Sequence, residues 1–192
     1  LMLTGDQIYA DDVAGPMLQA IHQVISLLGL YSESFSSACV ADSDELYSSP
    51  DCYYQRKNIL PRTRVGDNWY RRGGVKHIFS SSFAHNHMIT FAEWMAMYIL
   101  VWSPAMWSYI RFEESRIPAQ FQAIWKKETK IICAFIERVS HAQRLFAHIP
   151  TYMIFDDHDI TDDWNLTAKW EKQAYGHPFT RQIIGNGLMT YL

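Results

Sequence analysis

The alternation of hydrophobic and polar residues shows two short apolar runs that are far apart in the chain. Leu1-Met2-Leu3 reads as the end of a buried strand, and Thr151 to Phe155 is a five-residue, β-prone run typical of a buried parallel strand. Each run ends directly in an acidic turn. In open α/β sheets, ligands gather beyond the carboxyl ends of the strands, so we expect the two turns to meet in space.

The segment between the two runs is rich in helical periodicity. Residues 13–29 predict a helix that Asp11 or Asp12 can cap and that Gly29 can end. Residues 88–102 are apolar nearly all round, which indicates a buried helix, and its Glu93 is expected to be a paired buried carboxylate. A long amphipathic helix is predicted over 118–147, where apolar residues keep the helical period.

The remaining stretches add shorter elements to this pattern. A mostly irregular region with helical turns is predicted over 30–68, and a short strand over 75–80. Together these patterns predict one predominantly helical α/β domain in four parts: a strand-end motif at 1–11, a helix-rich segment at 13–149, a second strand and acidic motif at 151–165, and C-terminal helices at 166–192.

Composition indicates a surface that meets something else. The chain has 192 residues, 48% of them hydrophobic and 15% aromatic, and its charged fraction of 19% is low. We expect apolar surface to be covered by missing flanking segments of the same protein or by an oligomer partner. A net charge of -3 excludes a general basic footprint for nucleic acid. Basic residues do cluster at 62–64 and 71–76, where a solvated loop is favoured over an anion site.

The cysteines and the hydropathy of the chain indicate in which cellular compartment the protein is expected. Cys39, Cys52 and Cys133 are an odd number without a metal-ligand spacing, which favours a reducing compartment over a disulfide framework. The chain shows no signal peptide, so the cytoplasm is favoured. The longest apolar run, 88–102, is shorter than the roughly 20 residues of a membrane span, so no membrane span is expected.

The first acidic motif is Gly5-Asp6-Gln7-Ile8-Tyr9-Ala10-Asp11. A glycine after a strand allows a tight turn, and the next carboxylate then projects from the strand end. An aspartate can bridge two cations, and the Tyr9 phenolate suits a hard trivalent ion. The alternative is a strand-ending turn in which Asp6 caps the next helix.

The second motif is Asp156-Asp157-His158-Asp159, followed by Asp162-Asp163. Five carboxylates within eight residues repel one another, and a bound metal is the usual source of relief. An exposed acidic loop with capping roles is the alternative. Because the cluster follows an apolar strand, a metal site is favoured. His85 and His87 have a possible chelating spacing, but core or substrate-contact roles are favoured for them.

Together, Gly-Asp-x-x-Tyr and a strand ending in Asp-Asp-His-Asp resemble the alkaline phosphatase D-like (PhoD-like) family of the calcineurin-like metallophosphoesterase superfamily. The resemblance implies that the chain is a fragment of an α/β/β/α sandwich. It also implies hydrolysis of phosphate monoesters or diesters by a dinuclear metal centre and metal-bound hydroxide.

The resemblance also implies residue roles. Asp6, Tyr9 and Asp157 correspond to metal ligands, and His158 to the catalytic histidine that contacts the phosphoryl oxygen or protonates the leaving group. The side chains of Asp11, Asp156, Asp159 and Asp162 are expected to orient these ligands without binding the metals themselves. The two ions are expected to be iron with calcium, with zinc or manganese as alternatives.

Two superfamily motifs are absent from these 192 residues, namely an earlier Asp-x-His and a later Gly-His-x-His. We therefore expect activity to belong to the full-length protein, and this chain alone to be incomplete. The alternative function is a non-catalytic, helix-rich interaction or scaffold domain with a degenerate metal site. It is consistent with the missing ligands and the charge-poor composition.

Overall fold

The computed structural model describes residues 1–64, 74–81 and 84–192. Its helices are α1 (Gly15–Leu28), α2 (Ser43–Ser48), α3 (Phe91–Trp102), α4 (Gln122–His148), α5 (Ala168–Gly176) and α6 (Pro178–Tyr191). Its strands are β1 (Met2–Thr4), β2 (Arg62–Arg64), β3 (Val75–His77) and β4 (Tyr152–Ile154). The fold is predominantly helical with few strands, as the hydrophobic pattern predicts. The predicted irregular region extends over 65–68, which lie outside the described residues.

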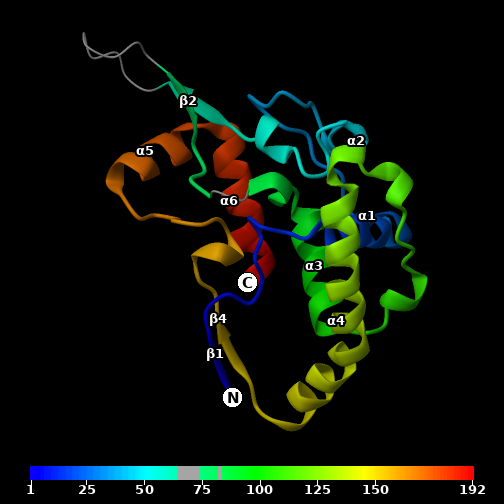
Figure 1. Ribbon diagram of the computed structural model, residues 1–192. Helices are drawn as coiled ribbons and strands as arrows, with labels where there is room; N and C mark the ends of the chain where they lie inside the picture. Colours follow the sequence, from blue (N-terminus) through cyan, green and yellow to red (C-terminus); the bar gives the residue numbers. More distant parts are fainter. Residues whose placement is uncertain (65–73, 82–83) are drawn as a thin grey trace.

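Helix α3 lies at the centre of the helical layer, in contact with α1, α4 and α6 (Figure 1). Its apolar surface explains this position, because Trp94 and Leu100 are fully buried. The helix begins at a capping box in which Thr90 accepts from the backbone of Glu93 and Glu93 accepts from Thr90. Pro104, soon after Trp102, is consistent with the end of the helix.

Helix α1 differs from expectation at its start. Its N-cap is Ala14, without a side-chain cap, so neither Asp11 nor Asp12 caps it. The N–H of Gly15, a buried residue, donates instead to Glu128 Oε2 of α4 at 2.8 Å. The predicted end is confirmed, because Gly29 adopts the left-handed conformation with φ of 60°.

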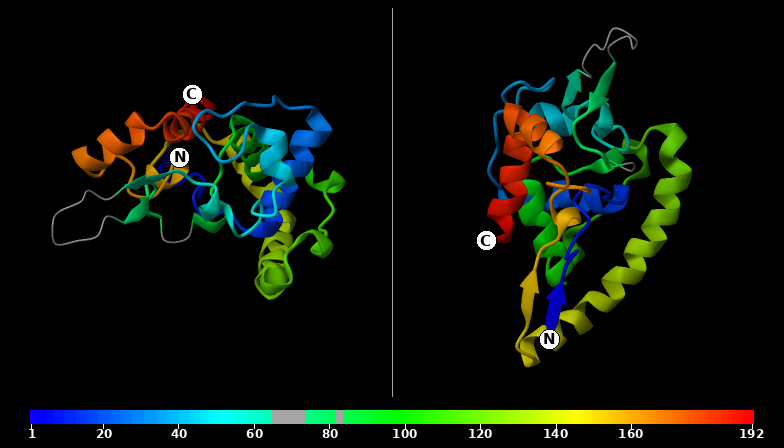
Figure 2. Two further views of the ribbon diagram at one scale, coloured as in Figure 1. Left: turned by 90° about the horizontal axis from the view of Figure 1, so that it is seen from above. Right: turned by 90° about the vertical axis from the view of Figure 1, so that its left-hand side faces the viewer.

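Strands β1 and β4 form a two-stranded parallel sheet with Leu3 paired to Met153. They run side by side, and their starts lie near the C-terminal end of α4 (Figure 2). The expectation of buried strands is wrong for this chain, because Met2 is 73% exposed and Tyr152 71% exposed. A parallel sheet normally has both faces covered, and within the described residues no layer covers this pair.

Two further parts flank the site. Strands β2 and β3 form an antiparallel pair, which shortens the predicted strand at 75–80 to Val75–His77. Helices α5 and α6 follow the second acidic motif and contact each other. Among the described residues, no helix combines the length and the hydropathy needed to cross a bilayer.

Candidate metal centre

The first acidic turn is built on two unusual backbone conformations. Gly5 has φ of 133° and Asp6 has φ of 39°. A side chain at Gly5 would also collide with the second turn, because its Cβ would lie 2.9 Å from Asp156 Oδ2. Glycine is therefore required here both by its φ and by the close approach of Asp156. The turn places the carboxylate of Asp6 beside the second motif.

The second acidic turn is a 3-10 turn over Asp157–Asp159, capped by Asp156. Both carboxylate oxygens of Asp157 are held: Oδ1 accepts from the N–H of His158 and Oδ2 from the N–H of Asp163, each at 3.0 Å. Backbone N–H groups of the same turn therefore donate to the Asp157 carboxylate. Asp163, which provides one of them, adopts a left-handed conformation with φ of 60°. These two hydrogen bonds fix the orientation of the Asp157 carboxylate without the help of a ligand.

Asp159 joins the two turns. Its buried carboxylate accepts from the backbone N–H of Gln7 at 3.1 Å and of Ile8 at 2.9 Å. It also accepts from the N–H of Asp156 at 3.0 Å. The Gln7 amide adds a contact to the carbonyl of Ile154 at 3.2 Å. Motifs that are about 150 residues apart in sequence are therefore held as one unit.

The three carboxylates of Asp6, Asp156 and Asp157 come together at this junction, each offering an oxygen within 4.8 Å of the others. One Asp6 oxygen, Oδ2, accepts from the Tyr9 hydroxyl at 2.8 Å. The other, Oδ1, is buried and has no partner among the described residues. An unpaired buried carboxylate oxygen is costly, and a cation would satisfy it. The donor set therefore fits a metal ion.

His158 lies next to this cluster and is oriented by Asp11. Its Nδ1 donates to the buried Asp11 carboxylate at 3.0 Å, and its ring packs against Tyr9 with centroids 4.5 Å apart. Partial burial lowers the pKa of His158, but the hydrogen bond and charge of Asp11 outweigh it, so the pKa lies above its usual value. The carboxylate of Asp162 lies 3.9 Å from His158 Nε2.

The structure thus brings together all the site residues named from the sequence. The junction contains Asp6, Tyr9, Asp157 and His158. Asp11 contacts His158, and Asp159 contacts the backbone of the first turn. Asp156, expected only to orient ligands, lies within the carboxylate group itself, because Gly5 lets the two turns touch. A second possible group contains Asp157, Asp162 and Asp163. The roles of these residues as ligands stay predictions.

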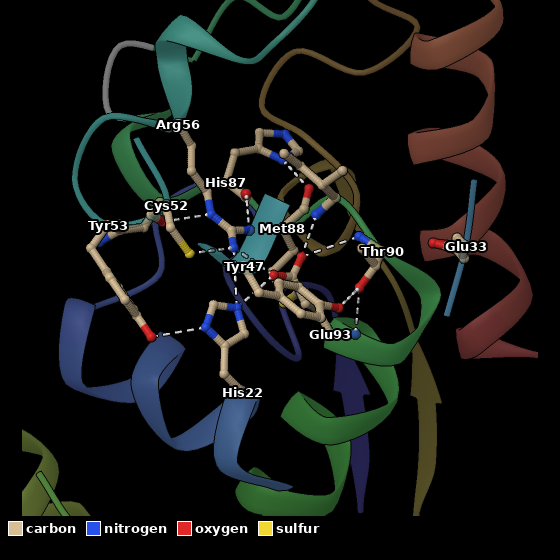
Figure 3. Close-up of polar contacts among 12 residues, drawn as sticks. His22, Glu33, Tyr47, Cys52, Tyr53, Arg56, His87, Met88, Thr90 and Glu93 are labelled. Carbon is tan, nitrogen blue, oxygen red and sulfur yellow. Dashed lines mark hydrogen bonds and ion pairs between the residues drawn. The ribbon is translucent and has the colours of Figure 1, made fainter. Parts of the chain in front are cut away.

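A buried polar network joins Arg56 and Glu93 to His22 of α1 (Figure 3). The guanidinium of Arg56 contacts Glu93 at 2.6 Å, and both side chains are fully buried. Glu93 also accepts from the backbone of Ile89 at 2.7 Å and lies 2.9 Å from His22 Nε2. Although burial raises the pKa of Glu93, the charge of Arg56 outweighs this effect and holds it well below its usual range. The expected pairing of Glu93 is confirmed.

This network reaches the acidic turns through the segment around His87. Arg56 donates to the carbonyl of His87 at 3.0 Å, and His87 Nε2 lies 3.0 Å from the Thr161 hydroxyl. The N–H of Met88 donates to the carbonyl of Ala10 at 2.8 Å. The N–H of Ala10 then donates to the carbonyl of His158 at 2.8 Å. His87 is a fully buried core residue, as favoured from the sequence, whereas His85 is exposed and does not belong to the core.

Sequence reasoning missed two of these features. Arg56 lies in a stretch predicted as irregular, and no periodic signal indicates that its guanidinium is fully buried. The N–H of Asp163 was also missed as a support for Asp157. A weak signal existed for the latter, because aspartate and asparagine tolerate the left-handed conformation that turns the chain there.

Comparisons with known proteins identify no relative of this chain. No family model, no curated protein and no solved structure matches it.

Proposed function

We propose that this chain supplies part of a dinuclear metal centre that hydrolyses phosphate esters. The observation that carries the proposal is Asp6, whose buried Oδ1 has no partner among the described residues while carboxylates from the second turn lie beside it. The motif resemblance to alkaline phosphatase D-like enzymes supports the same reaction class. The missing ligands would come from flanking segments of the same protein or from an oligomer partner.

The ligand set favours hard cations. Asp6, Asp156 and Asp157 would hold an ion, with the Tyr9 hydroxyl as a further oxygen donor. Carboxylate and phenolate oxygens suit calcium, manganese or ferric iron, whereas zinc sites are rich in histidine and cysteine. When bound, the ions lower the pKa of water and neutralise charge on the phosphoryl oxygens.

Side chains of this chain would supply the proton that the leaving oxygen needs. Asp11 engages Nδ1 of His158, which leaves Nε2 as the nitrogen that can donate to the leaving oxygen. The raised pKa of His158 favours the protonated ring that such a donor needs. The His158 side chain is 28% exposed, so a substrate can reach it. His158 would therefore act as general acid, and Asp11 as the group that orients it.

Hydrolysis of 4-nitrophenyl phosphate and of bis(4-nitrophenyl) phosphate with added Mn²⁺ or with Fe³⁺ and Ca²⁺ tests the proposal. The full-length protein should be active, and Asp6→Asn and Asp157→Asn should each lower kcat/KM by at least about 100-fold. Asp44→Asn, an exposed aspartate of α2, is the matched control. Unchanged activity in both site variants would reject the proposal.

A non-catalytic interaction domain is the second candidate, favoured by the uncovered β1–β4 sheet. Exposed apolar side chains on both strands, such as Met2 and Tyr152, suit a covering partner or segment. Size-exclusion chromatography combined with metal titration discriminates between the candidates. Self-association without metal binding would favour the interaction domain, and metal binding would favour the enzyme.

A further inference from the structure

A small cavity of about 190 Å³ lies beside the second acidic turn, between the β3 region and α5. Such a volume is below the roughly 300–1,000 Å³ of most small-molecule pockets, so it suits one functional group rather than a whole metabolite. Its polar lining includes Lys76, Ser80, Asp163, Thr167, Lys169 and Trp170. These residues come from two stretches of the chain, 76–80 and 163–170.

The cavity adjoins the candidate metal centre through direct hydrogen bonds. Asp163, which lines it, donates its backbone N–H to Asp157 Oδ2 at 3.0 Å. Ser80, which also lines the cavity, donates its hydroxyl to the carbonyl of Asp162 at 3.4 Å. Asp163 therefore belongs both to the lining of the cavity and to the second possible carboxylate group, with Asp157 and Asp162.

The charges of the cavity differ from those of the turn beside it. Lys76 and Lys169 provide two ammonium groups against the single carboxylate of Asp163, and neither lysine has a carboxylate partner within the described ranges. The indole N–H of Trp170 is buried and without an acceptor among the same residues. The cavity thus presents net positive charge next to a strongly acidic turn.

Surface lysines are usually solvated, and the basic cluster at 71–76 was interpreted in that way from the sequence. Lys76 is exposed, as this interpretation expects, but it also lines the same cavity as Lys169 of α5. Arg71 and Arg72 lie outside the described residues. The convergence of two lysines from different elements beside a candidate phosphate-ester site indicates an anion subsite.

We propose that this cavity binds a second phosphoryl group of the substrate, so that preferred substrates are phosphate esters whose leaving group carries another phosphate. This inference rests on the proposed function for the position of the first phosphoryl group. Lys76 and Lys169 neutralise the second group, and the Thr167 and Ser80 hydroxyls and the Trp170 indole surround it. Ammonium–phosphate contacts are charge-assisted and weaken with salt.

Isothermal titration at low ionic strength tests the subsite with two ligands, propane-1,3-diol bisphosphate and propyl phosphate, in the presence of Mn²⁺. Both ligands offer one phosphate to the metal centre, so the ratio of their Kd values isolates the cavity. The wild-type chain should prefer the bisphosphate by about tenfold. The double variant Lys76→Met/Lys169→Met should reduce the preference to roughly twofold or less. Lys172→Met, also on α5 but outside the cavity, should retain it.

Equal affinities in the wild type, or equal losses in the double variant and in Lys172→Met, would overturn the subsite. Hydrolysis of 4-nitrophenyl phosphate reports on the proposed function separately, because that substrate has no second phosphate. An active protein without bisphosphate preference defeats the subsite alone. An inactive full-length protein whose bisphosphate preference depends on the two lysines defeats the proposed function and supports the cavity as an anion site.

Discussion

Asp159 accepts a hydrogen bond from the backbone N–H of Ile8 at 2.9 Å, across 151 residues of sequence. The same carboxylate accepts from Gln7 and Asp156. One side chain therefore holds the first acidic turn against the second. This contact acts together with the β1–β4 pairing and the hydrogen bond from Ala10 N–H to the carbonyl of His158, which also join the two motifs.

Replacing Asp159 with alanine should destabilise the chain and separate the turns. Three backbone N–H groups would lose their acceptor, and an unsatisfied buried donor costs roughly 1–3 kcal/mol. We expect the free energy of unfolding in urea to fall by about 3 kcal/mol. The control Asp163→Asn should change it by less than about 0.5 kcal/mol. A loss no larger than that of the control would contradict the bridging role.

The Gly5→Ala variant should be impaired by both strain and collision. Its φ of 133° disfavours any side chain, and the new Cβ would meet Asp156 Oδ2 at 2.9 Å. Gly29→Ala is the matched control, because Gly29 also has positive φ but nothing lies within 4 Å of its Cβ. Gly29→Ala should cost about 1 kcal/mol and leave metal affinity intact.

The Gly5→Ala change should cost more than this and weaken metal binding, because Asp156 must move. Urea unfolding and metal titration of the two variants give the comparison. Equal effects of the two substitutions would show that the approach of Gly5 to Asp156 does not shape the site.

The Arg56–Glu93 pair should be sensitive to the loss of one partner. The Glu93→Gln change leaves the guanidinium of Arg56 buried without its counter-charge, which typically costs about 3–5 kcal/mol. We expect a large drop in the midpoint of thermal unfolding. Glu114→Gln, which removes only the exposed pair with Lys126, should have an effect below about 1 kcal/mol. Similar effects for both would contradict the importance of the buried pair.

The free energy of unfolding should fall with decreasing pH in two separate pH ranges, one set by His87 and the other by Glu93. Burial lowers the pKa of His87, so the unfolded chain takes up a proton that the folded chain resists, and stability falls as the pH drops below about 6.5. The pKa of Glu93 is lowered chiefly by Arg56, whose charge outweighs the opposing effect of burial. Its contribution is present above about 4.5 and is lost as the pH falls below that value.

The His87→Gln change should therefore flatten the dependence of stability on pH between 7 and 5, measured by urea unfolding. His141→Gln removes a histidine from the exposed surface of α4 and serves as the control. A slope that is unchanged in His87→Gln would show that the buried imidazole does not control this window.

The sequence predicted the convergence of Asp6 and Asp157 because strand periodicity and acidic strand ends are local signals. It also predicted the end of α1 at Gly29 and the burial of Glu93. It could not predict that β1 and β4 are uncovered, because an apolar strand looks the same whether or not a covering layer is present. The partnership of Arg56 with Glu93 joins segments that no local pattern connects.

The most direct test of the metal centre is calorimetric titration of the wild-type chain and of Asp6→Asn with Mn²⁺. The unpaired Oδ1 of Asp6 should bind the ion, so the wild type should bind Mn²⁺, and the variant should lose at least about tenfold in affinity. Asp44→Asn should bind as the wild type does. Wild-type binding that Asp6→Asn leaves unchanged, or no binding even in the full-length protein, would contradict the metal centre.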